Sequence, residues 1–250
     1  MNFLQNLLSK SRSEANGIFF ASLEKILGFK PKASNYYLRA FTHRSMQEKN
    51  EFGHPVNYER LEFLGDAVLS TVISTYLFEN SPDGNEGYLT VMRSKIVSRK
   101  NLNQIGHDLG LVDLLITNMP EQQHGKNISG NLFEALIGAI YLDRGFKFTE
   151  KFIQKHLISA YVNLSELEKK VTSYKSLIIK WCQKHKFEFD FCTKADDGKD
   201  HEKHFSVCFY INNELVSKAR ETSKKRAEEK AAKRAYYALQ NKIESKSLNI

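Results

Sequence analysis

The sequence is poor in cysteine, with only Cys182, Cys192 and Cys208 among its 250 residues and no CxxC pair. An odd number of cysteines without that spacing argues against a disulfide framework and a zinc site, and fits a reducing compartment. The N-terminus lacks a basic segment followed by a sustained apolar run, so we expect no signal peptide. Nor do we find a segment approaching the roughly 18 apolar residues that a membrane span needs. We therefore expect a cytoplasmic protein without membrane association.

Residues 1–165 also lack convincing alternation of apolar and polar residues, the pattern of a half-buried β-strand. They show helical periodicity instead, interrupted by turn and stop residues such as Gly28 and Gly110. We predict helices over residues 18–27, 36–45, 57–77, 86–109, 128–143 and 148–164. The sequence thus predicts an all-α domain over residues 1–165, followed by a short polar linker over residues 165–173.

The pattern changes in residues 171–241. Three short alternating segments, residues 187–192, 205–211 and 214–220, are bounded by turn residues and predict strands. Asn212 and Asn213 predict a tight hairpin turn between the last two. Helices are predicted over residues 174–184 and 222–239. This part should be a small α+β domain with the order α-β-β-β-α.

Positive charge is concentrated at the C-terminal end. The whole chain has a formal charge of +8. Residues 1–170 contain 20 Lys and Arg against 18 Asp and Glu, whereas residues 171–250 contain 17 against 11. The excess in the smaller region indicates a polyanionic partner for that domain.

The segment 57–77 carries acidic residues in a nearly all-apolar helix. Glu62 and Asp66 are four residues apart and share one face, and Glu59 lies close to both. A helix that is apolar nearly all round is usually buried, and buried carboxylates need a cation or an ionic partner. The cation could be a metal ion; the alternative is an ordinary core helix whose acids pair with Arg60 or another arginine.

A second nearly all-apolar helix, residues 128–143, repeats this feature with Asn131 and Glu134 on one face. Its small residues would let another helix approach closely. If the two polar faces converge, Glu62, Asp66 and Glu134 join the Asn131 carbonyl in an all-oxygen cluster. Such ligands select Mg²⁺ or Mn²⁺, which can activate water for attack on a phosphodiester. The alternative is two structural polar pairs in a helical bundle.

The segment from Glu59 to Leu69, ERLEFLGDAVL, matches the signature of the ribonuclease III family at every position, so the chain resembles that family. The resemblance extends to residues 41–45 (FTHRS), to Glu86-Gly87 followed by Met92-Arg93, and to residues 133–143. It implies that Glu62, Asp66 and Glu134 are metal-binding and catalytic acids, and that Glu86 is a further active-site acid. The family usually has Asp where this chain has Asn131, which would contribute a metal ligand without a negative charge.

The C-terminal region resembles the double-stranded-RNA-binding domain at residues 174–177, 198–203 and 223–228. Cations in the first turn of a helix oppose its dipole, so their presence there suggests phosphate binding rather than helix stability. The alternative is a merely solvated basic face. Ile179 and Lys180 stand where the family often has a Gln-Glu pair that reaches the minor groove. The residues predicted to bind RNA are Lys175, His201, Lys224, Lys225 and Arg226.

The two resemblances together imply an endoribonuclease that cleaves double-stranded RNA with Mg²⁺, for which Mn²⁺ can substitute. They imply a homodimer that leaves 5′-phosphate and 3′-hydroxyl ends with a short 3′ overhang, and roles in rRNA processing and mRNA turnover. Two other classes are a non-catalytic double-stranded-RNA binder and a metal-dependent hydrolase of small phosphoesters. The retained acids argue against the first, and the basic C-terminal domain argues against the second.

Overall fold

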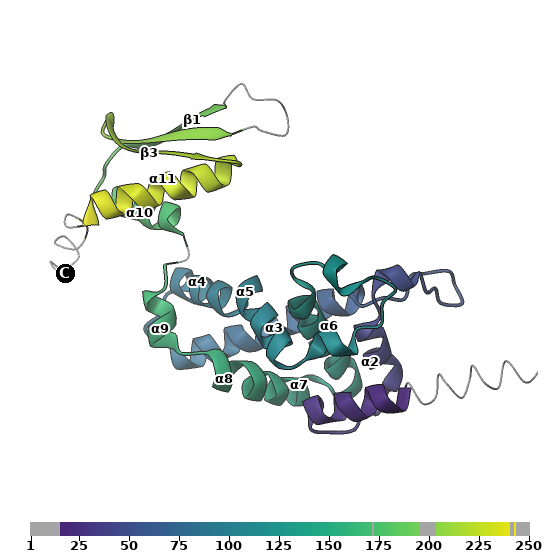
Figure 1. The fold of residues 1–250 in the computed structure, drawn as a ribbon. Coiled ribbons are helices and arrows are strands. Elements are labelled where there is room, and N and C mark those ends of the chain that lie inside the picture. Colours follow the sequence, from purple (N-terminus) through teal and green to yellow (C-terminus); the bar gives the residue numbers. More distant parts are fainter. Residues whose placement is uncertain (1–15, 172, 196–203, 241–242, 244–250) are drawn as a thin grey trace, which may run out of the picture. The chain divides into compact units, whose positions relative to one another are not determined.

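The computed structural model describes residues 16–171, 173–195, 204–240 and 243. The chain divides into two compact units, residues 1–167 and 168–250. The first is helical and the second combines a sheet with two helices (Figure 1). Both predicted fold classes are therefore confirmed.

The first unit is a bundle of helices. Apart from two isolated bridges, its described residues contain no strand. Residues 16–27 are helical. The other elements are α2 (Ser34–Phe41), η1 (Arg44–Met46), α3 (Glu59–Asn80), α4 (Glu86–Ile96), α5 (Arg99–Asp108), η2 (Leu111–Leu114), η3 (Glu121–Gln123), α6 (Ile128–Arg144), α7 (Phe146–Ile153), η4 (Gln154–Ile158), α8 (Ser159–Tyr161) and α9 (Leu164–Lys169).

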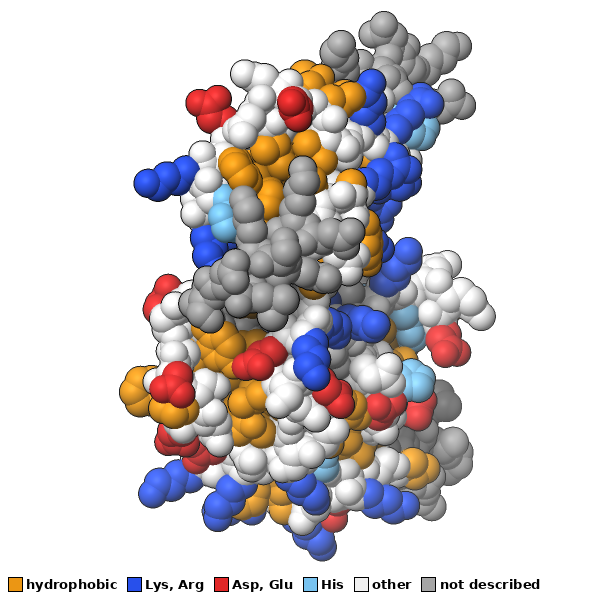
Figure 2. All heavy atoms as spheres, turned by 90° about the vertical axis from the view of Figure 1, so that its left-hand side faces the viewer, with side chains coloured by type: hydrophobic (Ala, Val, Ile, Leu, Met, Phe, Trp, Pro, Cys, Tyr) orange, Lys and Arg blue, Asp and Glu red, His pale blue; other side chains and the backbone are white. Residues whose placement is uncertain are grey.

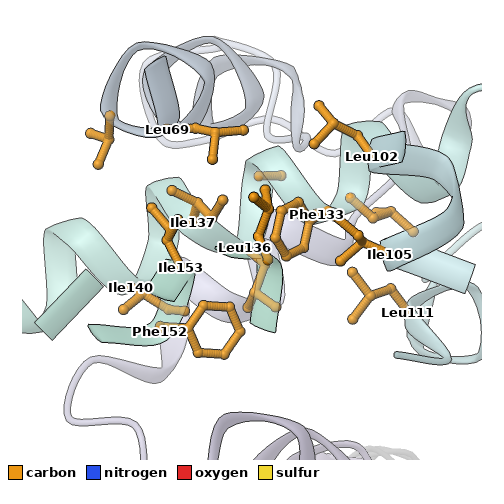
Figure 3. Close-up of a cluster of buried hydrophobic side chains, with 14 of the residues drawn as sticks. Leu69, Leu102, Ile105, Leu111, Phe133, Leu136, Ile137, Ile140, Phe152 and Ile153 are labelled. Carbon is orange, nitrogen blue, oxygen red and sulfur yellow. The ribbon is translucent and has the colours of Figure 1, made fainter. Parts of the chain in front are cut away.

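Helix α6 is the centre of the bundle. Its Phe133, Leu136 and Ile137 are fully buried and pack among side chains of neighbouring helices (Figure 3). Two glycines bring α3 against α6: a Cβ atom on Gly65 would overlap the carbonyl oxygen of Glu134, and one on Gly138 would overlap that of Leu61. The backbones of α3 and α6 therefore meet directly beside the acidic residues, as the small residues in the sequence predicted.

Helix α3 is less buried than we expected. Leu61, Leu69 and Ile73 face the core, but Phe63 is 80% exposed and Phe78 is 74% exposed. The prediction of all-round burial is therefore wrong for a single chain, because α6 packs closely against one side of α3 while Phe63 and Phe78 on other sides stay exposed. By length and composition, α3 is also the one described helix that could cross a membrane, contrary to our expectation. A core helix of a soluble protein passes the same test, so this is weak evidence for a span.

The predicted helix 86–109 is two helices. Ser98 caps α5 by accepting a hydrogen bond from the backbone of Asn101, at 3.5 Å. The Asn101 amide in turn donates to the carbonyls of Lys95 and Ile96, at 3.3 Å each, and so satisfies the end of α4. This break makes Arg99 the first residue of a new helix rather than a mid-helix residue.

The predicted linker is partly helical. Its first residues belong to α9, where Leu167 is buried. The buried Lys95 ammonium donates to the Leu167 carbonyl at 2.6 Å. The predicted helix 148–164 is likewise interrupted, by the π-helical turn η4 and by residues 162–163.

The second unit has the predicted element order. It consists of α10 (Tyr174–Lys184), β1 (Phe189–Ala195), β2 (Phe205–Ile211), β3 (Glu214–Glu221) and α11 (Lys224–Ala238). The sheet is antiparallel with the order β1-β2-β3, and both helices lie on one side of it (Figure 1). Asn212 and Asn213 have φ of 48° and 66° and form the predicted hairpin turn. Val207 and Phe209 of β2 are buried against alanines of α11.

Candidate active site

The acidic residues of α3 and α6 line a cleft of about 890 Å³ in the first unit. The N-terminal ends of α3, α5 and α6 meet there, joined by the loop before α6 and by residues that follow α2. Its lining comprises His43, Arg44, Tyr58, Glu59, Glu62, Phe63, Asp66, Val97, Arg99, Leu102, Asn103, Met119, Gln123, Gly125, Lys126, Asn127, Ile128, Gly130, Asn131 and Glu134. The structure thus brings together all four residues predicted to bind metal.

Glu134 is the most strongly perturbed acid of the cleft. It is half-buried at the α3–α6 contact. Burial first, then the carboxylates of Asp66 and Glu62, raise its pKa to about 7, while Arg99 lowers it. Carboxylates that repel one another in a partly dry cleft require a positive charge for all of them to ionise.

Glu62 is held in a similar environment. Burial and the neighbouring Glu59 raise its pKa, and Arg99 opposes the increase. Glu59 itself is exposed and engaged elsewhere, since it accepts from the Asn57 amide at 3.3 Å and lies 3.7 Å from Arg44. Asp66 is exposed on the next turn of α3. Among the described residues, Glu62, Asp66 and Glu134 are therefore the acids of the cleft that have no ionic partner at contact distance.

Asn131 lies on the same face of α6 and is half-buried. Burial raises the pKa of Tyr58, and the neighbouring Asn131 side chain opposes that increase. The Asn131 carboxamide carries an uncharged oxygen atom that can act as an acceptor or a ligand. The chemistry of Asn131 therefore fits a neutral oxygen ligand.

The cleft acids fit a divalent cation by their chemistry. They offer only oxygen atoms, which hard cations prefer, and burial together with neighbouring carboxylates raises the pKa values of Glu62 and Glu134. Within the described residues, however, no three His, Cys, Asp or Glu side chains stand close enough together to hold a metal ion. The side chains would therefore have to move toward a bound cation.

Glu86 does not belong to this cleft. It begins α4, is exposed, and accepts a hydrogen bond from Thr90 at 3.1 Å. The cleft lies at the start of α3, whereas Glu86 follows the opposite end, and the 15 residues from Asp66 to Asn80 already span about 21 Å. Its prediction as an active-site acid is not supported within one chain.

Arg99 and His43 line the cleft, although neither of them was assigned a role from the sequence. Arg99 was missed because residues 86–109 were predicted as one helix. In the structure α5 begins at Arg99, so Arg99 is a cation in the first turn of a helix. The same feature indicated phosphate binding at Lys224. His43 belongs to the FTHRS segment, which carried the family resemblance without an assigned role.

The predicted RNA-binding residues are placed differently from one another. Lys224, Lys225 and Arg226 are exposed in the first turn of α11, which Ser223 caps through the Arg226 backbone at 3.3 Å. Lys175 is instead paired internally, with Nζ 2.6 Å from Glu228 and 5.0 Å from the centre of the Phe191 ring. His201 lies outside the described residues. Lys and Arg side chains project from both units on the face drawn in Figure 2.

A helical bundle with an acidic cleft, followed by an α-β-β-β-α unit with a basic helix start, defines a hydrolytic nuclease with an attached nucleic-acid-binding domain. Residues 34–161 match the family model described as ribonuclease-III-like, and residues 174–239 match the double-stranded RNA binding motif. The chain belongs to the ribonuclease III family, the endoribonucleases that cleave double-stranded RNA.

Similar proteins agree with this membership. Ribonuclease 3 of Zunongwangia profunda is 56% identical over 243 residues, which cover 97% of this chain and 100% of that protein. Ribonuclease 3 of Flavobacterium psychrophilum is 54% identical over 248 residues, which cover 98% of this chain and 100% of that protein. The solved nuclease domain of ribonuclease III from Campylobacter jejuni is 33% identical with a TM-score of 0.50, covering 56% of this chain and 96% of that one.

Proposed function

We propose that this ribonuclease III acts as a Mg²⁺-dependent homodimer in the cytoplasm, with cleavage at the α3–α6 cleft. The observation that carries the proposal is the convergence of Glu62, Asp66 and Glu134 from two closely packed helices. Products with 5′-phosphate and 3′-hydroxyl ends, and roles in rRNA processing and mRNA turnover, are those of the family. The absence of a CxxC pair and the three free cysteines support a reducing compartment.

Glu62, Asp66 and Glu134 would hold the cation, with the Asn131 carboxamide as a neutral ligand. An all-oxygen ligand set favours Mg²⁺, and Mn²⁺ accepts the same ligands. The bound ion supplies an activated water and neutralises charge that develops on the phosphate. The protein contributes the close α3–α6 contact, which holds together the two backbones that carry these acids.

The exposed Phe63 supports the homodimer. It is 80% exposed in the single chain although it lines the cleft beside Glu62. A second chain that packs against the start of α3 would remove this apolar side chain from water. The related Campylobacter jejuni nuclease domain is described as having a region involved in dimer formation. Two sites in a dimer can cut both strands of a duplex in one encounter, which leaves a short 3′ overhang.

A cleavage assay on a long RNA duplex, run with Mg²⁺, with Mn²⁺ and with chelator, tests this proposal, and sedimentation of the intact chain gives its oligomeric state. We expect short duplex products with either ion, none with chelator, and a dimer. Binding of the duplex without cleavage at any ion concentration would instead favour the non-catalytic binder.

Replacing Asn131 by Asp should lower the Mg²⁺ concentration needed for half-maximal cleavage. A carboxylate attracts a divalent ion more strongly than a carboxamide dipole does in a partly dry cleft. Without metal, Asn131→Asp should lower the melting temperature, because it adds a negative charge beside Glu134 and Asp66. A Mg²⁺ titration of cleavage and a melt in chelator measure both effects. If neither changes, Asn131 does not face the metal.

Replacing Lys224 and Lys225 by Ala should weaken duplex binding without destabilising α11. Two lost phosphate contacts reduce the slope of log K against log salt by about 2. The helix itself should not suffer, since both cations oppose its dipole. Duplex binding measured across salt concentrations checks this. Lys151→Ala with Lys155→Ala, an equal charge change on the exposed surface of the first unit, is the control, and an equal loss in the control would contradict the assignment.

A further inference from the structure

One ring nitrogen of His43 forms a hydrogen bond with the backbone. It caps η1, and its Nδ1 accepts a hydrogen bond from the backbone N–H of Ser45 at 3.1 Å. A nitrogen that accepts this bond carries no hydrogen, so the neutral ring carries its hydrogen on Nε2. The fold thus sets the tautomer of His43.

The other nitrogen, Nε2, has no hydrogen-bond partner among the described residues. Among the side chains that the structure describes, none accepts a hydrogen bond from His43 Nε2, and this atom is not among the buried polar atoms that lack a partner. The ring is half-buried, leans on Tyr58 with 5.9 Å between ring centres, and lines the acidic cleft. The Nε2–H group is therefore an accessible donor in the cleft.

The surroundings of His43 favour its neutral form. Burial first, then the charges of Arg44 and His124, lower the pKa of His43, and only Glu59 acts in the opposite direction. Neutrality preserves the bond that Nδ1 accepts, so the donor on Nε2 stays oriented.

Cations surround the same cleft. Arg44 comes from η1, Arg99 from the start of α5 and Lys126 from the loop before α6, and all three are exposed. We call these three residues the basic rim. A ligand that meets both the acids and the basic rim must be an anion that also accepts a cation, and a phosphodiester backbone meets this description.

We propose that His43 Nε2–H donates a hydrogen bond to a non-bridging phosphate oxygen of the RNA strand in the cleft, and so positions that strand against Glu62, Asp66 and Glu134. This inference rests on the proposed function of the cleft. It assigns a substrate contact to the FTHRS segment that is separate from metal binding, while Nδ1 keeps its structural bond to Ser45.

Two substitutions separate the two nitrogens. In His43→Asn the amide oxygen can occupy the Nδ1 position and keep the Ser45 bond, but the donor is lost. In His43→Gln the amide nitrogen can occupy the Nε2 position and keep the donor, but the cap is lost. Single-turnover cleavage of a short RNA duplex at saturating Mg²⁺, with a melt of each variant in chelator, distinguishes these effects. His54→Asn, the same change at an exposed residue outside the cleft lining, is the control.

We expect His43→Asn to cleave about 10-fold more slowly with a melting temperature near that of the unchanged protein, the loss expected for one charge-assisted hydrogen bond. His43→Gln should stay within about threefold in rate, because the donor remains. It should melt at a lower temperature, because the stabilising cap on η1 is lost. Cleavage by His43→Asn within about twofold of the unchanged protein would overturn the proposal. Equal losses of rate in the two variants would also overturn the proposal, because the rate would then not depend on the hydrogen-bond donor at the Nε2 position.

A measurement on the unchanged protein covers the case in which His43→Asn does not fold. Nitrogen-15 spectra of the histidine rings should show His43 protonated on Nε2 at neutral pH, and a ring protonated on Nδ1 would overturn the proposal. Glu134→Gln is assayed beside the variants on the same duplex. If it cleaves like the unchanged protein, the assignment of the cleft fails, whatever His43 does.

Discussion

Glu134→Gln is expected to reduce cleavage of an RNA duplex by about 1,000-fold or more, since losing a metal ligand removes several kcal/mol of transition-state stabilisation. RNA binding should be retained, because the basic residues at the start of α11 are unchanged. Single-turnover cleavage at saturating Mg²⁺ and duplex binding without cleavage measure the two effects. Turnover within a few-fold of the unchanged protein would remove Glu134 from the site.

The same substitution should have the opposite effect on stability. The pKa of Glu134 rises from its ordinary 4.5 to about 7 in the folded protein. A raised carboxylate pKa means that the protonated form stabilises the fold; this stabilisation is complete below about pH 4.5 and is lost as the pH rises through about 7. Gln resembles the protonated form at every pH. In chelator, Glu134→Gln should therefore melt higher than the unchanged protein at pH 8 and nearly equally at pH 4.5.

Glu79→Gln is the matched control, because Glu79 is exposed at the far end of α3. It should change neither cleavage nor the pH dependence of the melting temperature. Added Mg²⁺ should reverse the order at pH 8, since the ion binds the carboxylate of the unchanged protein and stabilises it. A melting difference in chelator that is the same at pH 4.5 and pH 8 would mean that the Glu134 pKa is not raised.

Gly65→Ala is expected to destabilise the first unit by about 3 kcal/mol or more, because the added methyl group has no room and the backbones must separate. Its Cβ would overlap the carbonyl oxygen of Glu134 and lie 2.9 Å from the nitrogen of Gly138. Alanine gains about 1 kcal/mol of helix propensity over glycine, which is too little to offset an overlap with backbone atoms. Separation of α3 from α6 should also move Glu62 and Asp66 away from Glu134, so cleavage should fall even at temperatures where the variant stays folded.

Thermal melts and cleavage rates test this prediction, with Gly17→Ala as the control. Gly17 is in the helix of residues 16–27, and a Cβ atom there meets nothing within 4 Å. That substitution should leave stability unchanged or slightly increased, because only the propensity and unfolded-state terms remain. If Gly65→Ala melted like Gly17→Ala, the close α3–α6 contact would be wrong.

Local patterns in the sequence determined most of the elements. The periodicity of α3, α6 and α10 and the alternation of β2 and β3 recovered these elements, because each element turns its hydrophobic residues toward the core of its own unit. The spacing of Glu62 and Asp66, and of Asn131 and Glu134, placed each pair on one helix face for the same reason. The shared cleft followed from the small residues that let α6 approach α3.

Tertiary structure decided what these local patterns could not. The end of α4 depends on Asn101, whose amide satisfies carbonyls of the preceding helix, and that break is what places Arg99 at the cleft. Glu86 matches a family position in the sequence, but it follows the far end of α3. The length of that helix separates Glu86 from the cleft, and the sequence motif does not show this distance. Lys175 was predicted to bind RNA, but its ammonium group forms an ion pair with Glu228 on α11. The pKa of Glu134 is raised by its burial at the α3–α6 contact and then by Asp66 and Glu62 on the other helix. The sequence alone determined which groups are present and on which helix face they lie, whereas long-range packing determined which of them share one cleft, because distances between helices depend on contacts that no local pattern encodes.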